Sequence, residues 1–117
     1  MNTTEFEKSK IISLEQCVEY ATDSIVSKTA LKKDTGNISV FSFDKGQQLS
    51  EHAAPFDATV IILDGKADII INKQRNTLHK GEMIIMPANI PHAVEATDKF
   101  KMMLIMIKDA KKPLLIE

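Results

Sequence analysis

The sequence predicts an all-β protein, a sandwich or barrel of short antiparallel strands. The four glycines, Gly36, Gly46, Gly65 and Gly81, lie at breaks between apolar runs. The runs between these breaks are short and rich in Val, Ile, Phe and Thr, which favour strands. Turn residues every ten to twenty positions along such runs are typical of antiparallel sandwiches and barrels.

The expected strands follow these breaks in order. The segment Lys33-Asp34-Thr35-Gly36 predicts a hairpin turn between the first two strands. The nearly continuous apolar run 59–63 predicts a strand that is buried on both faces, and Asp64-Gly65 predicts the turn that follows it. The expected strands span residues 24–32, 37–44, 47–53, 58–64, 66–72, 76–79, 83–87, 91–96 and 99–107.

Before the first strand, one segment favours a short helix. Ser13 and Gln16 have the spacing of a capping box, and Leu14, Cys17, Val18 and Ala21 would share one helical face. A short strand over 18–20 is the alternative. We expect an N-terminal tail or arm over 1–20, a barrel over 21–110 and a C-terminal tail over 111–117.

Composition excludes several classes of function. With 117 residues, 44% of them hydrophobic and 26% charged, the chain has the size and composition of one globular domain. Its net charge of -1 lacks the positive surplus of nucleic-acid-binding proteins. The longest apolar run, 102–107, is too short to span a membrane. A single cysteine, Cys17, and an N-terminus without an apolar signal segment favour a cytoplasmic location.

Two histidines occur within a recognisable pattern of glycines and prolines. The first part runs Gly46-QQLSE-His52-Ala53-Ala54-PFD-Ala58-TVIILD-Gly65. The second part runs Gly81-EMIIM-Pro87-Ala88-Asn89-Ile90-Pro91-His92. This spacing resembles the two motifs of the cupins, which are small double-stranded β-helix or jelly-roll barrels. The resemblance implies the same fold here, with the two motifs on strands that line the barrel.

The sequence departs from the cupin pattern at the implied metal ligands. Ala54 stands where metal-binding cupins place a second histidine, Ala58 where they place a glutamate, and Asn89 where they place a glycine. His52 and His92 remain, and two imidazoles hold a divalent transition metal weakly. Three interpretations stay open for this pair. It could bind the polar group of a small ligand, hold a metal completed by water, or make hydrogen bonds within the pocket.

Strand alternation extends this site to its neighbours. Counting in twos places Gln48 and Ala54 on the face of His52, Val60 and Ile62 on the face of Ala58, and Val94 on the face of His92. The predicted ligand-binding set is therefore His52, His92, Gln48, Ala54, Ala58, Val60, Ile62 and Val94. Met102, Leu104 and Met106 share a second face, but the sequence does not say whether that face lines the barrel.

Two functions fit these residues. The first is a binding module that holds a small organic ligand in a largely aliphatic pocket with two histidines. The alternative is a metal-dependent cupin enzyme of the oxygenase, isomerase or lyase type, with a two-histidine metal site completed by water. We also expect a homodimer, which the resemblance implies. Ile25, Val26, Ala30 and Leu31 leave both faces of segment 24–32 apolar, so that an outer strand there would need cover.

Overall fold

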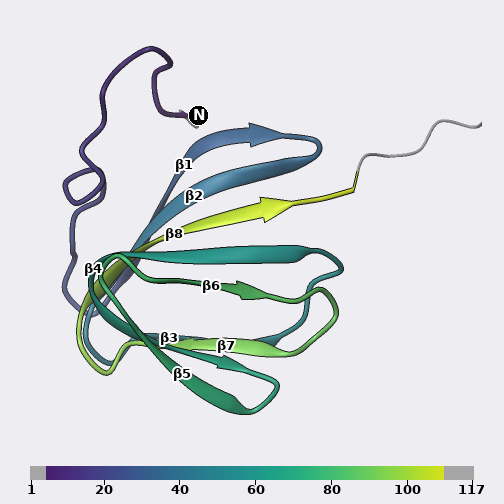
Figure 1. The fold of residues 1–117 in the computed structure, drawn as a ribbon. Helices are drawn as coiled ribbons and strands as arrows, with labels where there is room; N and C mark the ends of the chain where they lie inside the picture. Colours follow the sequence, from purple (N-terminus) through teal and green to yellow (C-terminus); the bar gives the residue numbers. More distant parts are fainter. Residues whose placement is uncertain (1–4, 110–117) are drawn as a thin grey trace, which may run out of the picture.

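The computed structural model describes residues 5–109, and these form eight β-strands without any helix (Figure 1). The all-β prediction is therefore confirmed. The predicted strands 58–64 and 66–72 are one continuous strand, bent in its middle, so nine expected strands become eight. The strands are β1 (Ile25–Lys33), β2 (Gly36–Phe43), β3 (Gln48–His52), β4 (Asp57–Ile71), β5 (Gln74–His79), β6 (Met83–Met86), β7 (His92–Glu95) and β8 (Phe100–Ile107).

The strands form two layers that share β4. The first layer contains β1, β2, β8, the first half of β4, and β6, and the second contains β3, β7, the second half of β4, and β5. At one end, which we call the closed end, the bend in β4 and three short links join the two layers. The links are 44–47 between β2 and β3, 80–82 between β5 and β6, and 96–99 between β7 and β8, and the two strands of each pair face each other. The opposite end holds the turns 34–35, 53–56, 72–73 and 87–91, and we call it the mouth.

The bend in β4 depends on a glycine. Gly65 has φ +74°, a conformation that residues with a side chain rarely adopt. A Cβ atom there would overlap the carbonyl oxygen of Lys99, and it would also press on Phe100. Gly65 is the last residue of β4 that pairs with β8, and from Lys66 onward β4 pairs with β5 in the second layer.

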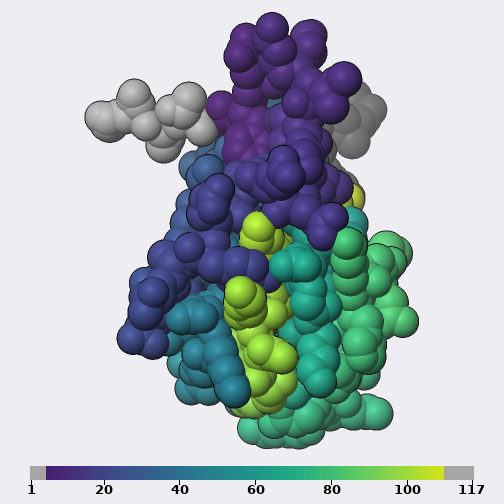
Figure 2. All heavy atoms as spheres, turned by 90° about the vertical axis from the view of Figure 1, so that its left-hand side faces the viewer, coloured from purple at the N-terminus to yellow at the C-terminus, as the bar shows by residue number. Residues whose placement is uncertain are grey.

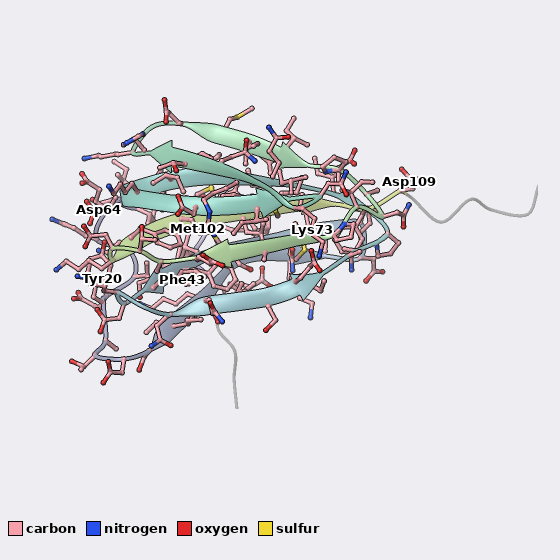
Figure 3. All side chains as sticks on the ribbon, turned by 90° about the horizontal axis from the view of Figure 1, so that it is seen from below. Tyr20, Phe43, Asp64, Lys73, Met102 and Asp109 are labelled. Carbon is pink, nitrogen blue, oxygen red and sulfur yellow. The ribbon has the colours of Figure 1, made fainter. Side chains whose placement is uncertain are left out.

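The main core lies between the layers. The rings of Phe43 and Phe100 stack with their centroids 4.6 Å apart, and Met102 is buried beside them (Figure 3). Met102, Leu104 and Met106 all face this core, which answers the question of the methionine face. The buried members of the core are Phe43, Ala58, Val60, Ile62, Ala67, Ile69, Leu78, Met86, Val94, Ala96, Phe100 and Met102.

A second, smaller cluster lies on the outside of the first layer, where the N-terminal segment covers it. Val18 is fully buried against Val40 and Leu63 (Figure 2 shows the N-terminal segment in purple over the strands). The Tyr20 hydroxyl donates a hydrogen bond to Asp64 Oδ2 at 2.6 Å, and these two residues lie at the closed end of the fold in Figure 3. The N-terminal segment is therefore fastened to the barrel.

This segment differs from its prediction in one respect. The Gln16 N–H donates to the Ser13 carbonyl, which makes a single turn, and neither a helix nor a strand forms over 13–21. Packing of Val18 against the sheet, rather than helical hydrogen bonding, holds these residues. The predicted C-terminal tail, 111–117, lies outside the described residues.

Candidate functional site at the barrel mouth

The residues that face inward at the mouth form one row on each layer. Cross-strand partners share a face of a sheet, so the register defines these rows. The row of the second layer is His52, His92, Ile71 and Gln74. The row of the first layer is Lys32, Asn37, Met106, Ala58 and Met86. The mouth therefore combines polar and apolar groups, whereas the rows beneath it on β8, β4 and β7 are apolar.

The two predicted histidines come together in the row of the second layer. His52 on β3 is the direct cross-strand partner of His92 on β7, and their ring centroids are 4.4 Å apart in an edge-to-face arrangement. His92 is only 6% exposed, whereas His52 is open to solvent. The two halves of the motif thus meet at one point, as the resemblance to the cupin motifs implies.

Hydrogen bonds fix the tautomer of both rings. His52 Nδ1 lies 2.9 Å from the carbonyl oxygen of Ser50, and His92 Nδ1 lies 3.3 Å from that of Ile90. A carbonyl oxygen can only accept, so each neutral ring carries its proton on Nδ1. Each Nε2 then holds a lone pair, which can accept a hydrogen bond or coordinate a metal.

The environment keeps the buried ring neutral. Burial, followed by the proximity of His52, holds the pKa of His92 below its usual value, and the hydrogen bond with the Ile90 carbonyl opposes this effect. His92 therefore stays an uncharged acceptor at neutral pH.

The loops at the mouth are joined to one another. The Asn89 N–H donates to the Ala54 carbonyl at 2.6 Å, which ties the loop after β3 to the loop before β7. Asn89 has φ 65°, so this asparagine adopts the left-handed conformation expected of the glycine in the cupin motif. Ala54 is half-buried in this contact.

Gln48 lies on the outer face of β3, so the prediction that it shares the face of His52 is wrong. A bulge between Leu49 and His52 shifts the register, so Leu49 and His52 share the inner face although they are three residues apart. Gln48 pairs with Glu95, whose carboxylate binds Arg75 on the outside of the barrel. Gln48 lines an outer hollow of about 360 Å³ instead.

The predicted aliphatic lining forms the packed floor beneath the mouth. The exposed fractions of Ala58, Val60, Ile62 and Val94 are 5%, 0%, 1% and 2%, and all four belong to the main core. Ala58 lies in the mouth row, and the other three lie deeper. Their direct contact with a ligand stays a prediction, because core side chains occupy the space beside them here.

Asn37 is one of the mouth residues that sequence reasoning missed. Asn37 lies in the inner row of β2 beside Met106, and its side-chain Oδ1 is buried without a hydrogen-bond partner among the described residues. No motif includes this position. Its place at the mouth depends on how β2 pairs with β8 and faces β3, which the sequence alone does not reveal.

The side chains present do not form a usual transition-metal site. Such sites have three or four protein ligands, and within 5–109 no group of three His, Cys, Asp or Glu side chains could hold an ion. His52 and His92 would supply two nitrogens, and water would have to supply the rest.

Comparison with known proteins agrees with this architecture. The family profile described as "Cupin domain" matches residues 39–108. No curated protein matches the chain. Across the described residues, no helix could span a membrane.

Three solved structures are similar over most of the chain. A conserved protein of unknown function from Streptococcus pyogenes is 37% identical with a TM-score of 0.87, covering 95% of this chain and 97% of that one. A cupin 2 conserved barrel domain protein from Leptotrichia buccalis is 43% identical with a TM-score of 0.80, covering 83% of this chain and 47% of that one. A cupin superfamily protein from Desulfitobacterium hafniense is 27% identical with a TM-score of 0.84, covering 93% and 100%. The chain belongs to the cupin family.

Proposed function

We propose that this cupin is a small-molecule-binding protein whose ligand contacts His52 and His92 at the mouth of the barrel. The observation that carries the proposal is the paired geometry of the two rings. They are cross-strand partners, and both Nδ1 atoms are bonded to backbone carbonyls, so two Nε2 lone pairs are free to contact a ligand. Fixed polar groups beside an apolar surface are the usual features of a small-molecule site.

The alternative, a metal-dependent enzyme, has narrower support. The hydrogen bonds from Nδ1 to carbonyl oxygens are the arrangement that orients histidine ligands in metalloproteins. This arrangement is equally suited to accepting hydrogen bonds from an organic ligand. The site offers a metal only two protein ligands, so water would have to supply the others. Binding of an organic ligand needs no such additional groups.

Mass spectrometry can test the proposal. Protein purified without an affinity tag would be examined by native mass spectrometry and by elemental analysis. We expect a retained organic molecule that is lost in the variants His52→Ala and His92→Ala. His79→Ala is the matched control, because His79 is the exposed last residue of β5 and contacts Glu82. A stoichiometric transition metal, or a ligand retained by both site variants, would contradict the proposal.

We further propose that the protein forms a homodimer, through a different surface from the one that the sequence suggests. The sequence suggests that a partner covers the strand over 24–32, but the chain's own N-terminal segment covers part of this strand. Val26 packs against the N-terminal segment, and the Phe6 N–H donates to the Ala30 carbonyl on the edge of β1. The apolar surface that remains lies on the outer face of the first layer. Its central row of cross-strand partners is Leu31, Ile38, Ile105, Thr59 and Ile85.

Charge supports a second copy as the partner on this face. Lys28 and Lys33 lie on β1 at one side of the row, and Asp57 lies on β4 toward the other side. A two-fold axis along β8 would bring the basic side of one copy to the acidic side of the other.

Analytical ultracentrifugation tests this interface. We expect a dimer for the unmodified protein and a monomer for Ile105→Glu, because Ile105 lies in the middle of the row. The matched control is Ile70→Glu, which places the same charge on the outside of the second layer and should leave the dimer intact. A monomeric unmodified protein would contradict the proposal.

A further inference from the structure

The N-terminal segment holds three large apolar side chains in solvent. The exposed large apolar side chains among residues 5–109 are Ile11, Ile12 and Leu14 on this segment, Met83 and Ile85 on β6, and Ile107 at the end of β8. Ile11 has an exposed fraction of 103%, which means that it is fully exposed. Single exposed apolar residues are common, but three within four positions are typical of an interaction surface.

Residues 7–14, which we call the arm, are fastened to the barrel on both sides. Before the arm, the Phe6 N–H donates to the Ala30 carbonyl at 3.1 Å. After it, Lys80 Nζ lies 2.6 Å from Glu15 Oε2, and Lys101 Nζ donates to the Glu15 carbonyl. The N-terminal segment, purple in Figure 2, projects beyond the strands. Because its two ends are fixed, the arm loses little conformational entropy when it binds a partner.

These contacts place the arm on the β1 side of the first layer. Ala30 lies on β1, at the edge of the layer, and Lys101 lies on β8, in its middle. The arm therefore spans the outer face between these two strands. The two-fold axis along β8 that we propose for the homodimer brings this side of one copy to the β6 side of the other.

The β6 strand presents the matching apolar surface. Met83 and Ile85 are both more than half exposed, and they pair with Ile61 and Thr59 on β4. β6 pairs only with β4 among the described strands, so its other edge is free to meet a second chain.

Charge favours the same contact. The arm carries Lys8 and Lys10 against the single acid Glu7, so it is basic. Glu82 stands immediately before β6, and Asp57 begins the neighbouring strand β4. Opposite charges on the two surfaces favour their association.

We infer that, in the homodimer, the arm of each copy covers β6 of the other, with Ile11 against Met83 and Ile85. This inference rests on the homodimer proposed above, and it adds a contact outside the central row through Ile105. The exchange is reciprocal, so the assembly closes at two copies. The central row alone is a narrow strip, whereas a stable interface buries about 1,200–2,000 Å² in total. The two arms supply further area on both sides of the row.

Disulfide trapping tests the contact directly. Cys17 is the single cysteine, so Ile11→Cys and Ile85→Cys would be made separately in full-length Cys17→Ser protein. The Ile85→Cys chain is labelled with ¹⁵N, the two proteins are mixed and oxidised with diamide, and intact masses are measured. We expect disulfide-linked dimers that contain one labelled and one unlabelled chain.

The control mixture combines Ile11→Cys with Ile70→Cys, whose cysteine lies on the outside of the second layer, and it should give no mixed dimer. Equal yields in the two mixtures would overturn the inference. Dimers of Ile11→Cys with itself in place of the mixed species would also overturn it, because they would show that the two arms meet each other.

Sedimentation supplies a second measurement. Ile11→Ser removes the fully exposed apolar side chain and should raise the Kd of the dimer about tenfold, with an unchanged circular dichroism spectrum. Ile70→Ser makes the same change on the second layer and should leave the Kd unchanged.

The outcomes separate this inference from the proposed homodimer. If no mixed disulfide forms and Ile11→Ser leaves the Kd unchanged while Ile105→Glu gives monomers, the role of the arm is wrong and the homodimer stands. If the unmodified protein is a monomer, both proposals fail.

Discussion

The bend of β4 at Gly65 makes a quantitative prediction about stability. In Gly65→Ala the new side chain would occupy a left-handed backbone conformation, which costs about 1–2 kcal/mol. The Cβ atom would also overlap the carbonyl oxygen of Lys99, so β4 and β8 must separate. Forcing atoms into packed space costs a further ~1–3 kcal/mol. We therefore expect the free energy of unfolding to fall by about 3 kcal/mol.

Gly81→Ala is the matched control. Gly81 has φ +88°, but a Cβ atom there would meet no atom within 4 Å. In Gly81→Ala only the left-handed backbone conformation should lower the free energy of unfolding. Alanine also reduces the entropy of the unfolded chain, which offsets part of this loss, so the net cost should be about 1 kcal/mol.

Urea unfolding followed by circular dichroism measures both variants. The expected difference of about 2 kcal/mol corresponds to about 1 M in the midpoint for a protein of this size. Equal losses in the two variants would refute the reasoning, because they would show that the contact with Lys99 adds nothing.

Three further predictions concern Tyr20, His92 and the pair of Ala54 and Ala58. Tyr20→Phe removes the hydrogen bond to Asp64, and urea unfolding should show a free energy of unfolding lower by about 1–2 kcal/mol. Burial, followed by Asp64, raises the pKa of Tyr20 above its usual value of 10. Absorbance of this single tyrosine should therefore show phenolate only above pH 10, where the folded state begins to lose stability. Because the pKa of His92 is lowered in the folded state, stability should be full above pH 6.5 and fall as pH drops below it, and chemical unfolding of His92→Gln at several pH values should show a smaller fall. Ala54→His with Ala58→Glu should lower the Tm without metal, since the buried Ala58 position receives a carboxylate, and zinc should restore it if residues 46–65 map onto the metal-binding cupin motif.

Local sequence patterns predict much of this fold. Glycines and short β-branched runs mark the strands, and the resemblance of the two motif halves to those of cupins implies that His52 meets His92. The shared face of Met102, Leu104 and Met106 follows from alternation alone.

The failures have a common physical cause, which is tertiary geometry that alternation does not encode. The bulge between Leu49 and His52 inserts one residue into the count and moves Gln48 to the outside. Val18 is held by packing against Val40 and Leu63, contacts distant in sequence, so local helix signals around it were misleading. Asn37 becomes part of the mouth only because β2 faces β3.

The protonation of the two mouth histidines tests the central claim most directly. Long-range ¹H–¹⁵N correlation spectra at pH 8 distinguish a protonated ring nitrogen from an unprotonated one. The account predicts that both His52 and His92 carry the proton on Nδ1 and present an unprotonated Nε2, as their contacts with the carbonyls of Ser50 and Ile90 require. A proton on Nε2 of either ring would contradict the claim that the mouth presents paired acceptors to a ligand.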